Sequence, residues 1–505
     1  MYLDHPALEP FEPLLNTLHQ YVFHAGIDAL MERGIIRQDK ELPSAIRESP
    51  SVLRRFLRGC HYGFDLAQRQ IGAKVIEYEL QARELRGEIK EFRRRRAKAE
   101  QHSSEKLLAC IASRQLVLRR LVDSILQHLV HMEPWILRRT QVSDSIHPID
   151  PVVLARMLRT AAGLNKEDRR TIHLVSDLTT AVQIGDLVRL SLDSEPRRWE
   201  IIELKDGRVN ESLRTFLDQQ GASISALDTA NIEAEHGKHG VSQVQRMLRQ
   251  RRREEEIEKF WTEDEGIDPK TNLAMSLIPE AVEVRDYFDP LKAACTRAKD
   301  TGCEGFVVSN CLRGLVVSNE VFRRAGYRGI AHLFYHLGLR GGTCELSSPE
   351  NRDSEMDKIS RGWPFHNLLR ANLNAQWPSP VFMWPMPKEM LFDIVMGRLI
   401  LLVQIDFEAL FLLAREKGIE MSWVSDKAAD PLMRRSPIIP GSPQSRGVVA
   451  LIPGGSERAR VFLMVGFFAR MLLEFMGPEQ LLTLVREMID HSAQMITKKA
   501  DSGGV

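Results

Sequence analysis

Residues 183–207 read QIGDLVRLSLDSEPRRWEIIELKDG, and this stretch decides the expected fold of the central part of the chain. Its two runs rich in Ile, Val and Leu are separated by turn residues, a pattern that predicts two neighbouring strands. Asp186 stands at the start of the first strand, and Glu203 and Lys205 stand at the end of the second. Because side chains alternate between the two faces of a strand, Glu203 and Lys205 point to the same face.

These three residue types suit a metal site. Two carboxylates, from Asp186 and Glu203, together with a backbone carbonyl are hard oxygen ligands of the kind that Mg²⁺ prefers. A lysine beside them orients or deprotonates a water molecule and neutralises charge that develops on a phosphate. The second strand is otherwise apolar, with Ile201 and Ile202, so packing gives no reason for an inward-facing Glu203 and Lys205.

An acid, a strand-length gap and then acid-x-Lys resembles the motif of the PD-(D/E)xK nuclease superfamily, whose members have a mixed sheet flanked by helices. The resemblance covers about residues 150–260, and Gly185 stands where the name of the motif has Pro. Only the carboxylate ligates a metal, so this departure leaves the metal chemistry intact. The resemblance implies Mg²⁺ or Mn²⁺ held by Asp186 and Glu203, and Lys205 orienting the attacking water. The further acid that the family often takes from a preceding helix is not assigned.

Two alternatives stay open for this stretch. In the first, Asp206 and Gly207 form the turn of a plain β-hairpin, and Glu203 and Lys205 form a solvated cross-strand face. In the second, the nuclease-like fold is present but its site is degenerate. Convergence of Asp186, Glu203 and Lys205 within about 4–5 Å would distinguish a metal site from both alternatives.

A helix expected over residues 241–261 carries candidate nucleic-acid ligands. Gln245, Arg246 and Arg249 lie on it, and Gln245 and Arg249 share a face because they are four residues apart. Members of the superfamily often place such a polar helix beside the catalytic strand, where it contacts the substrate. The alternative is a surface helix whose arginines pair with Glu255 and Glu256.

A long helical hairpin is expected near the N-terminus. Apolar residues recur there in steps of three and four, and they resume after a polar break at 101–104, so two antiparallel helices form a coiled-coil arm. These residues are Phe64, Ile71, Val75, Tyr78, Ala82, Leu85, Ile89 and Phe92, then Leu108, Ile111, Leu118, Val122, Ile125 and Leu129. Arg93, Arg94, Arg95 and Arg96 lie near its turn. They form either a solvated tip or a contact for phosphate groups or an acidic partner.

Composition excludes several classes of protein. The chain has 505 residues, 43% hydrophobic and 27% charged, so wholesale disorder is excluded. A net charge of +1 excludes a uniformly basic protein, although local basic patches remain compatible with it. The six cysteines form no disulfide framework or C-x-x-C pair, and no phosphate loop, nucleophile elbow or HExxH motif occurs.

The sequence predicts a cytoplasmic protein with no membrane partner. The first residues lack the basic and apolar regions of a signal peptide. The most apolar stretch, residues 390–414, is interrupted by charged residues such as Asp393 and Arg398, so it is expected to form one buried or half-buried helix rather than a membrane span.

We therefore expect an α+β protein in three parts. Residues 1–145 form a helical domain with the coiled-coil arm, 146–320 a nuclease-like α/β domain with a mixed sheet, and 321–505 a mostly helical region. The expected function is metal-dependent hydrolysis of phosphodiester bonds in DNA, or in RNA as the alternative, in bacterial DNA processing or defence. The rival is a non-enzymatic scaffold whose arm binds a protein partner or a second copy of the chain.

Overall fold

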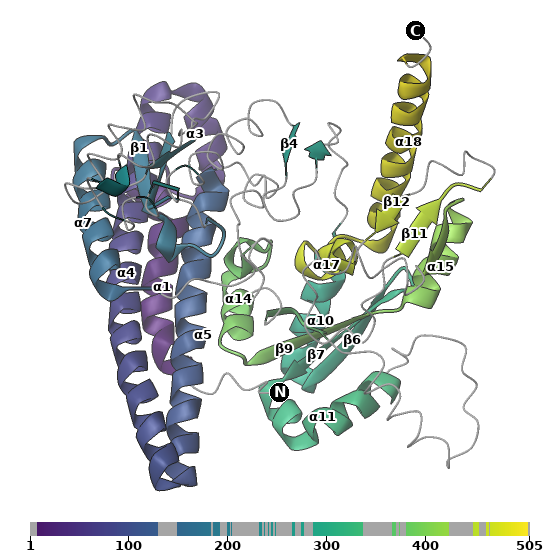
Figure 1. Ribbon diagram of the computed structural model, residues 1–505, viewed down its shortest axis with the longest axis horizontal. Coiled ribbons are helices and arrows are strands. Elements are labelled where there is room, and N and C mark those ends of the chain that lie inside the picture. Colours follow the sequence, from purple (N-terminus) through teal and green to yellow (C-terminus); the bar gives the residue numbers. More distant parts are fainter. Residues whose placement is uncertain are drawn as a thin grey trace. The chain divides into compact units, whose positions relative to one another are not determined.

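The computed structural model describes helices and strands along much of the chain (Figure 1). The described residues are 8–129, 149–182, 185–191, 199–202, 204, 286–336, 366–369, 373, 380–423, 448–453, 461–463 and 465–502, with short pieces between 232 and 276. The chain forms two compact units, Pro10–Leu277, and Ile278–Val505 together with Met1–Glu9. The expected boundaries after residues 145 and 320 therefore fall inside these units. The fold is mixed α+β, and every strand pair among the described residues is antiparallel.

Helices make up most of the described part of the first unit. They are α1 (Glu12–Phe23), α2 (Ala25–Met31), α3 (Leu42–Glu48), α4 (Pro50–Arg95), α5 (Lys98–Leu129) and α7 (Pro151–Glu167). Figure 1 shows α4 and α5 side by side as a long antiparallel hairpin, which confirms the expected arm. Its predicted apolar residues form the buried seam, apart from Phe92 and Leu108, which are half-buried.

The turn of this hairpin is not where the polar break predicted it. Helix α4 ends at Arg95 and is capped by Arg96, whose φ of 57° is left-handed; the Ala97 N–H then donates to the Phe92 carbonyl at 3.0 Å. Residues 101–104 lie within α5 instead. There the buried Ser104 hydroxyl faces α4 and donates to Glu88 at 3.3 Å. Because a left-handed cap usually has glycine, an arginine there gives no sequence signal.

The first unit also contains a three-stranded antiparallel sheet. Its strands are β1 (Thr171–Val175), β2 (Leu187–Ser191) and β3 (Trp199–Ile202), in the order β1-β2-β3, and a separate pair comprises β4 (Glu265–Ile267) and β5 (Ala274–Ser276). Leu187 pairs with both Val175 and Ile202, so the expected strand pair beginning at Asp186 is present.

Side chains from two helices cover the outer edge of β1. The Gln68 amide of α4 donates to the His173 carbonyl at 2.9 Å and accepts the Val175 N–H at 2.7 Å. From α7, the Asn165 side-chain oxygen accepts the His173 N–H at 2.7 Å. Gln68 and Asn165 are buried, so these side chains take the place of a neighbouring strand and attach the sheet to the helices.

Two buried histidines at this edge predict a loss of stability in mild acid. His61 donates from Nε2 to the Thr171 carbonyl at 2.9 Å, and burial lowers the pKa of both His61 and His173. The unfolded chain then binds more protons than the folded chain once the pH falls below about 6.5, so stability is complete above that pH and is lost below it. We expect the urea concentration at the unfolding midpoint to be lower at pH 5.5 than at pH 7.5.

A His61→Gln variant tests this origin, because the glutamine amide still donates to Thr171 but does not titrate. Its unfolding midpoint should change less with pH than that of the wild type. An equal pH dependence in the two proteins would show that His61 does not contribute.

The described residues of the second unit form two antiparallel sheets. The first consists of β6 (Cys303–Val308), β7 (Leu312–Ser318), β9 (Leu399–Ile405) and β8 (His366–Asn367), in that order, and the second of β10 (Glu420–Trp423), β11 (Val448–Leu451) and β12 (Val461–Leu463). The helices are α10 (Phe288–Thr301), α11 (Asn319–His336), α14 (Lys388–Val395), α15 (Phe407–Glu416), α17 (Val465–Leu473) and α18 (Pro478–Ser502). Helix α10 packs against β6 and β7, and α11 covers the other side of this sheet (Figure 1).

The expectation of one helix over residues 390–414 is wrong. The chain there forms most of α14, the whole of β9 and most of α15. Gly397 has a φ of 75° after α14, and the Asp406 carboxylate caps α15 by accepting the Ala409 N–H at 3.0 Å. A strand buried on both faces, as β9 is, has the same continuous apolar sequence as a buried helix, so periodicity does not separate them. None of the helices among the described residues combines the length and apolarity of a membrane span.

Candidate functional site

A glycine leads the chain into β2 at the candidate site. Gly185 has a φ of +68°, and a Cβ atom at this position would lie 2.2 Å from the Ile201 side chain of β3. Proline cannot adopt this backbone conformation, because its ring holds φ near −65°. The residue before Asp186 is therefore glycine because of a left-handed turn and a close approach to the neighbouring strand.

Asp186 lies at the junction of all three strands. Its N–H donates to the Ile202 carbonyl at 3.0 Å, and its carbonyl accepts the Ser176 N–H, also at 3.0 Å. Its half-buried carboxylate accepts the Leu204 N–H at 2.6 Å through Oδ2. The carboxylate therefore contacts the backbone of the residue between Glu203 and Lys205.

The other residues predicted for the catalytic centre, Glu203 and Lys205, lie outside the described residues. Among the described residues, which leave out Glu203, no group of three or more His, Cys, Asp and Glu side chains could hold a metal ion. Of the predicted nucleic-acid ligands on the later helix, Gln245 is helical and exposed, whereas Arg246 and Arg249 are outside the described parts.

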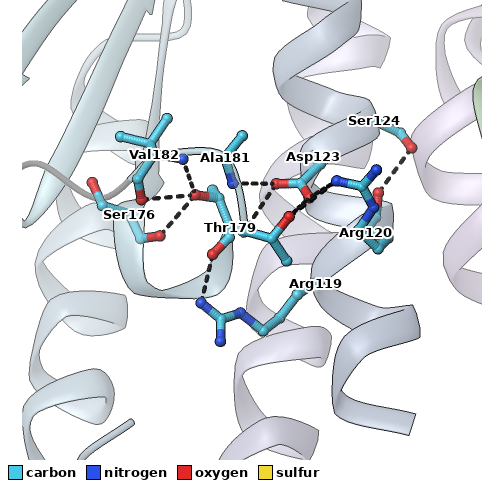
Figure 2. A network of polar contacts seen from close by, with 9 residues as sticks. Arg119, Arg120, Asp123, Ser124, Ser176, Thr179, Ala181 and Val182 are labelled. Atoms are coloured by element: carbon cyan, nitrogen blue, oxygen red, sulfur yellow. Dashed lines mark hydrogen bonds and ion pairs between the residues drawn. The ribbon is translucent and has the colours of Figure 1, made fainter. Parts of the chain in front are cut away.

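A buried polar network near Asp186 is absent from the sequence-based predictions (Figure 2). Arg120 and Asp123 of α5 are each 1% exposed and form an ion pair with an Nη1–Oδ2 distance of 2.9 Å. Asp123 also accepts hydrogen bonds from the Thr180 N–H at 2.8 Å and from the Thr180 hydroxyl at 2.5 Å. Thr180 belongs to the segment between β1 and Asp186, so α5 fixes the chain that leads into the candidate site.

Arg119 strengthens this attachment. Its Nη2 donates to the Thr179 carbonyl at 2.6 Å, as Figure 2 shows. Burial lowers the pKa of Arg119 to about 10, while the negative charges of Asp123 and Asp177 oppose that shift, and the guanidinium remains charged at neutral pH. The available sequence signal was the group Arg119, Arg120 and Asp123 within an otherwise apolar helical run.

The four arginines of the predicted tip do lie at the turn of the arm. Arg93 and Arg95 are 69% and 68% exposed, and each lies near a glutamate: Arg93 is 3.9 Å from Glu105, and Arg95 pairs with Glu91. Exposed pairs of this kind contribute little stability, so both guanidinium groups can exchange a glutamate for another anion.

The tip gives a salt-dependent prediction. If it contacts phosphates, replacing Arg93, Arg94, Arg95 and Arg96 together with glutamine should weaken nucleic-acid binding and reduce the slope of log affinity against log salt by up to about four. A filter-binding titration over a range of salt concentrations measures this slope. An unchanged slope would assign the tip to solvent or to a protein partner.

No family model, curated protein or solved structure matches this chain.

Proposed function

We propose that the chain is a metal-dependent nuclease that hydrolyses phosphodiester bonds in DNA, with RNA as the alternative substrate. Asp186, Glu203 and Lys205 would form its active site. The observation that supports this proposal most directly is the hydrogen bond from the Leu204 N–H to the Asp186 carboxylate. It joins the single acid of the motif to the centre of the Glu-x-Lys segment, 18 residues away in sequence.

The register of the sheet supports the same assignment. Leu187 pairs with Ile202, and if this register continues by one residue, Asp186 faces Glu203. If β3 keeps its two-residue period, Glu203 and Lys205 share the face of Ile201, which pairs with the buried Val188. We expect the three functional side chains on that face.

The residue types fit a hard divalent cation. Asp186 and Glu203 would hold Mg²⁺ or Mn²⁺ through carboxylate oxygens, the ligands that such ions prefer. A divalent cation bound there would activate a water molecule and polarise the phosphate. The Leu204 N–H orients the Asp186 carboxylate, and the Lys205 ammonium would orient the attacking water and offset the charge of the two carboxylates. Gln245, Arg246 and Arg249 would contact the substrate strand.

A Lys205→Met variant tests the proposal through stability as well as cleavage. Removing the ammonium should lower the melting temperature of the metal-free protein, because the two carboxylates lose their compensating cation. Added Mg²⁺ should restore much of the lost stability, since it binds the folded state, but cleavage should stay lost. The experiment is a thermal melt with EDTA and with Mg²⁺, beside a plasmid-cleavage assay.

Lys166→Met is the matched control, because Lys166 is an exposed lysine of α7 in the same unit. It should melt and cleave like the wild type. Full cleavage by Lys205→Met would remove Lys205 from the site and favour the plain β-hairpin. Equal melting temperatures with and without Mg²⁺ in every protein would favour the rival interpretation of a degenerate nuclease-like domain in an interaction protein.

A further inference from the structure

An arginine-lined hollow lies in the second unit, and none of its lining residues belongs to the proposed nuclease site. It is open to solvent and has a volume of about 490 Å³. Its lining residues come from the end of β7, the first turns of α11 and the residue before β9: Ser318, Asn319, Glu320, Arg323, Arg324 and Arg398. Three of the six are arginines, which concentrate positive charge on one small surface.

The base of the hollow is well anchored. The Asn319 N–H donates to the Arg398 carbonyl at 2.9 Å, so the start of α11 is attached to the start of β9. Beneath them, Phe322 of α11 belongs to a buried cluster that includes Val317 of β7 and Ile400 of β9. The arginines of α11 and Arg398 therefore approach from two elements that share one core.

Acidic neighbours offset part of the charge. Arg324 pairs with Glu320 at 2.5 Å, and Asp393 pairs with both Arg398, at 2.7 Å, and Lys299, at 2.5 Å. Among the described residues, these pairs join three cations, Arg324, Arg398 and Lys299, to two carboxylates. The Arg324–Glu320 pair is 80% and 71% exposed, so an incoming anion displaces Glu320 at little cost. Arg398 is more buried, and Asp393 holds its orientation through Nε.

We propose that this hollow binds the phosphate group of a nucleotide, either free or within a nucleic-acid strand. The planar guanidinium groups of Arg324 and Arg398 match two oxygens of a phosphate, and such charge-assisted pairs are strong and directional. Ser318 and Asn319 add a hydroxyl and an amide to the lining. The open side of the hollow leaves room for the nucleoside or for the rest of a strand.

The test is fluorescence anisotropy with a 5′-labelled single-stranded oligodeoxynucleotide in EDTA, followed by competition with AMP and with inorganic phosphate. The double variant Arg324→Gln/Arg398→Gln should bind the oligonucleotide about tenfold or more weakly, with a salt slope smaller by about two. The matched control is Arg297→Gln/Arg415→Gln, which removes two exposed arginines of the same unit and should change the affinity less than about twofold.

Folding is checked by the melting temperature. Asp393 keeps Lys299 as a partner when Arg398 is replaced, so the double variant should stay folded. If its melting temperature is nevertheless lowered, Arg323→Gln/Arg324→Gln, which changes only exposed side chains, supplies a second test. Competition by AMP would identify a free nucleotide as a sufficient ligand, and resistance to AMP would identify a strand; both support the phosphate site. No binding by the wild type, or equal losses in the hollow and control variants, would overturn it. Because the binding is measured in EDTA, where no metal-dependent cleavage occurs, the result can be interpreted even if the nuclease proposal fails.

Discussion

Replacing Asp123 with alanine is expected to lower the free energy of unfolding by about 3–5 kcal/mol. The substitution leaves the Arg120 guanidinium buried without its carboxylate partner, and an uncompensated buried charge is far more costly than the loss of an exposed pair. It also removes the acceptor of the Thr180 N–H and the Thr180 hydroxyl. Urea unfolding monitored by circular dichroism measures the loss.

Two further variants separate this mechanism from a general sensitivity to charge loss. Glu200→Gln breaks an exposed pair with Arg189, whose atoms are 2.8 Å apart, and should cost no more than about 1 kcal/mol. The double variant Arg120→Met/Asp123→Leu removes both buried charges and should lose less stability than the sum of its single variants. An Asp123→Ala protein within about 1 kcal/mol of the wild type would contradict the assigned role.

Replacing Glu203 with glutamine is expected to reduce cleavage by at least about a hundredfold while the melting temperature changes little. Glutamine keeps the shape of the side chain but removes the charge that would bind Mg²⁺. Losing a residue that merely orients a metal ligand typically costs about 10–100-fold, so losing a ligand itself should cost more. The measurement is the initial rate of plasmid nicking at saturating Mg²⁺.

Glu200→Gln is the matched control for this assay, because Glu200 lies on β3 three residues before Glu203 and is exposed. It should nick at the rate of the wild type. Retained activity in Glu203→Gln would remove Glu203 from the proposed site, and equal losses in both variants would point to damage to the strand rather than to a metal ligand.

The arm and the β2–β3 strand pair could be predicted from sequence because each depends on a local pattern. The seam residues of α4 and α5 recur in steps of three and four, and the two strands are runs rich in Ile, Val and Leu separated by turn residues. The turn at Arg96 could not be predicted, since nothing in its side chain favours a left-handed conformation. The helix–strand–helix order within residues 390–414 could not be predicted either, because a strand buried on both faces does not alternate apolar and polar residues.

The surroundings of the candidate site depend on contacts between distant residues. Asp123 and Thr180 are 57 positions apart, and Gln68 and His173 are 105 positions apart. A single sequence does not reveal such pairs, although a buried Asp in an apolar helix must have a partner. The conformation of Gly185 follows from the close approach of Ile201, which is likewise a tertiary contact.

Nicking of a supercoiled plasmid by the wild type and by Asp186→Asn, each with Mg²⁺, Mn²⁺ or EDTA, tests the central claim most directly. The asparagine oxygen can still accept the Leu204 N–H, so Asp186→Asn should fold normally while losing the charge needed by a metal ion. The nuclease assignment predicts nicking by the wild type with either metal, none with EDTA, and none by Asp186→Asn. A wild type that leaves the plasmid intact with both metals, or an Asp186→Asn variant that nicks it at the full rate, would contradict the assignment.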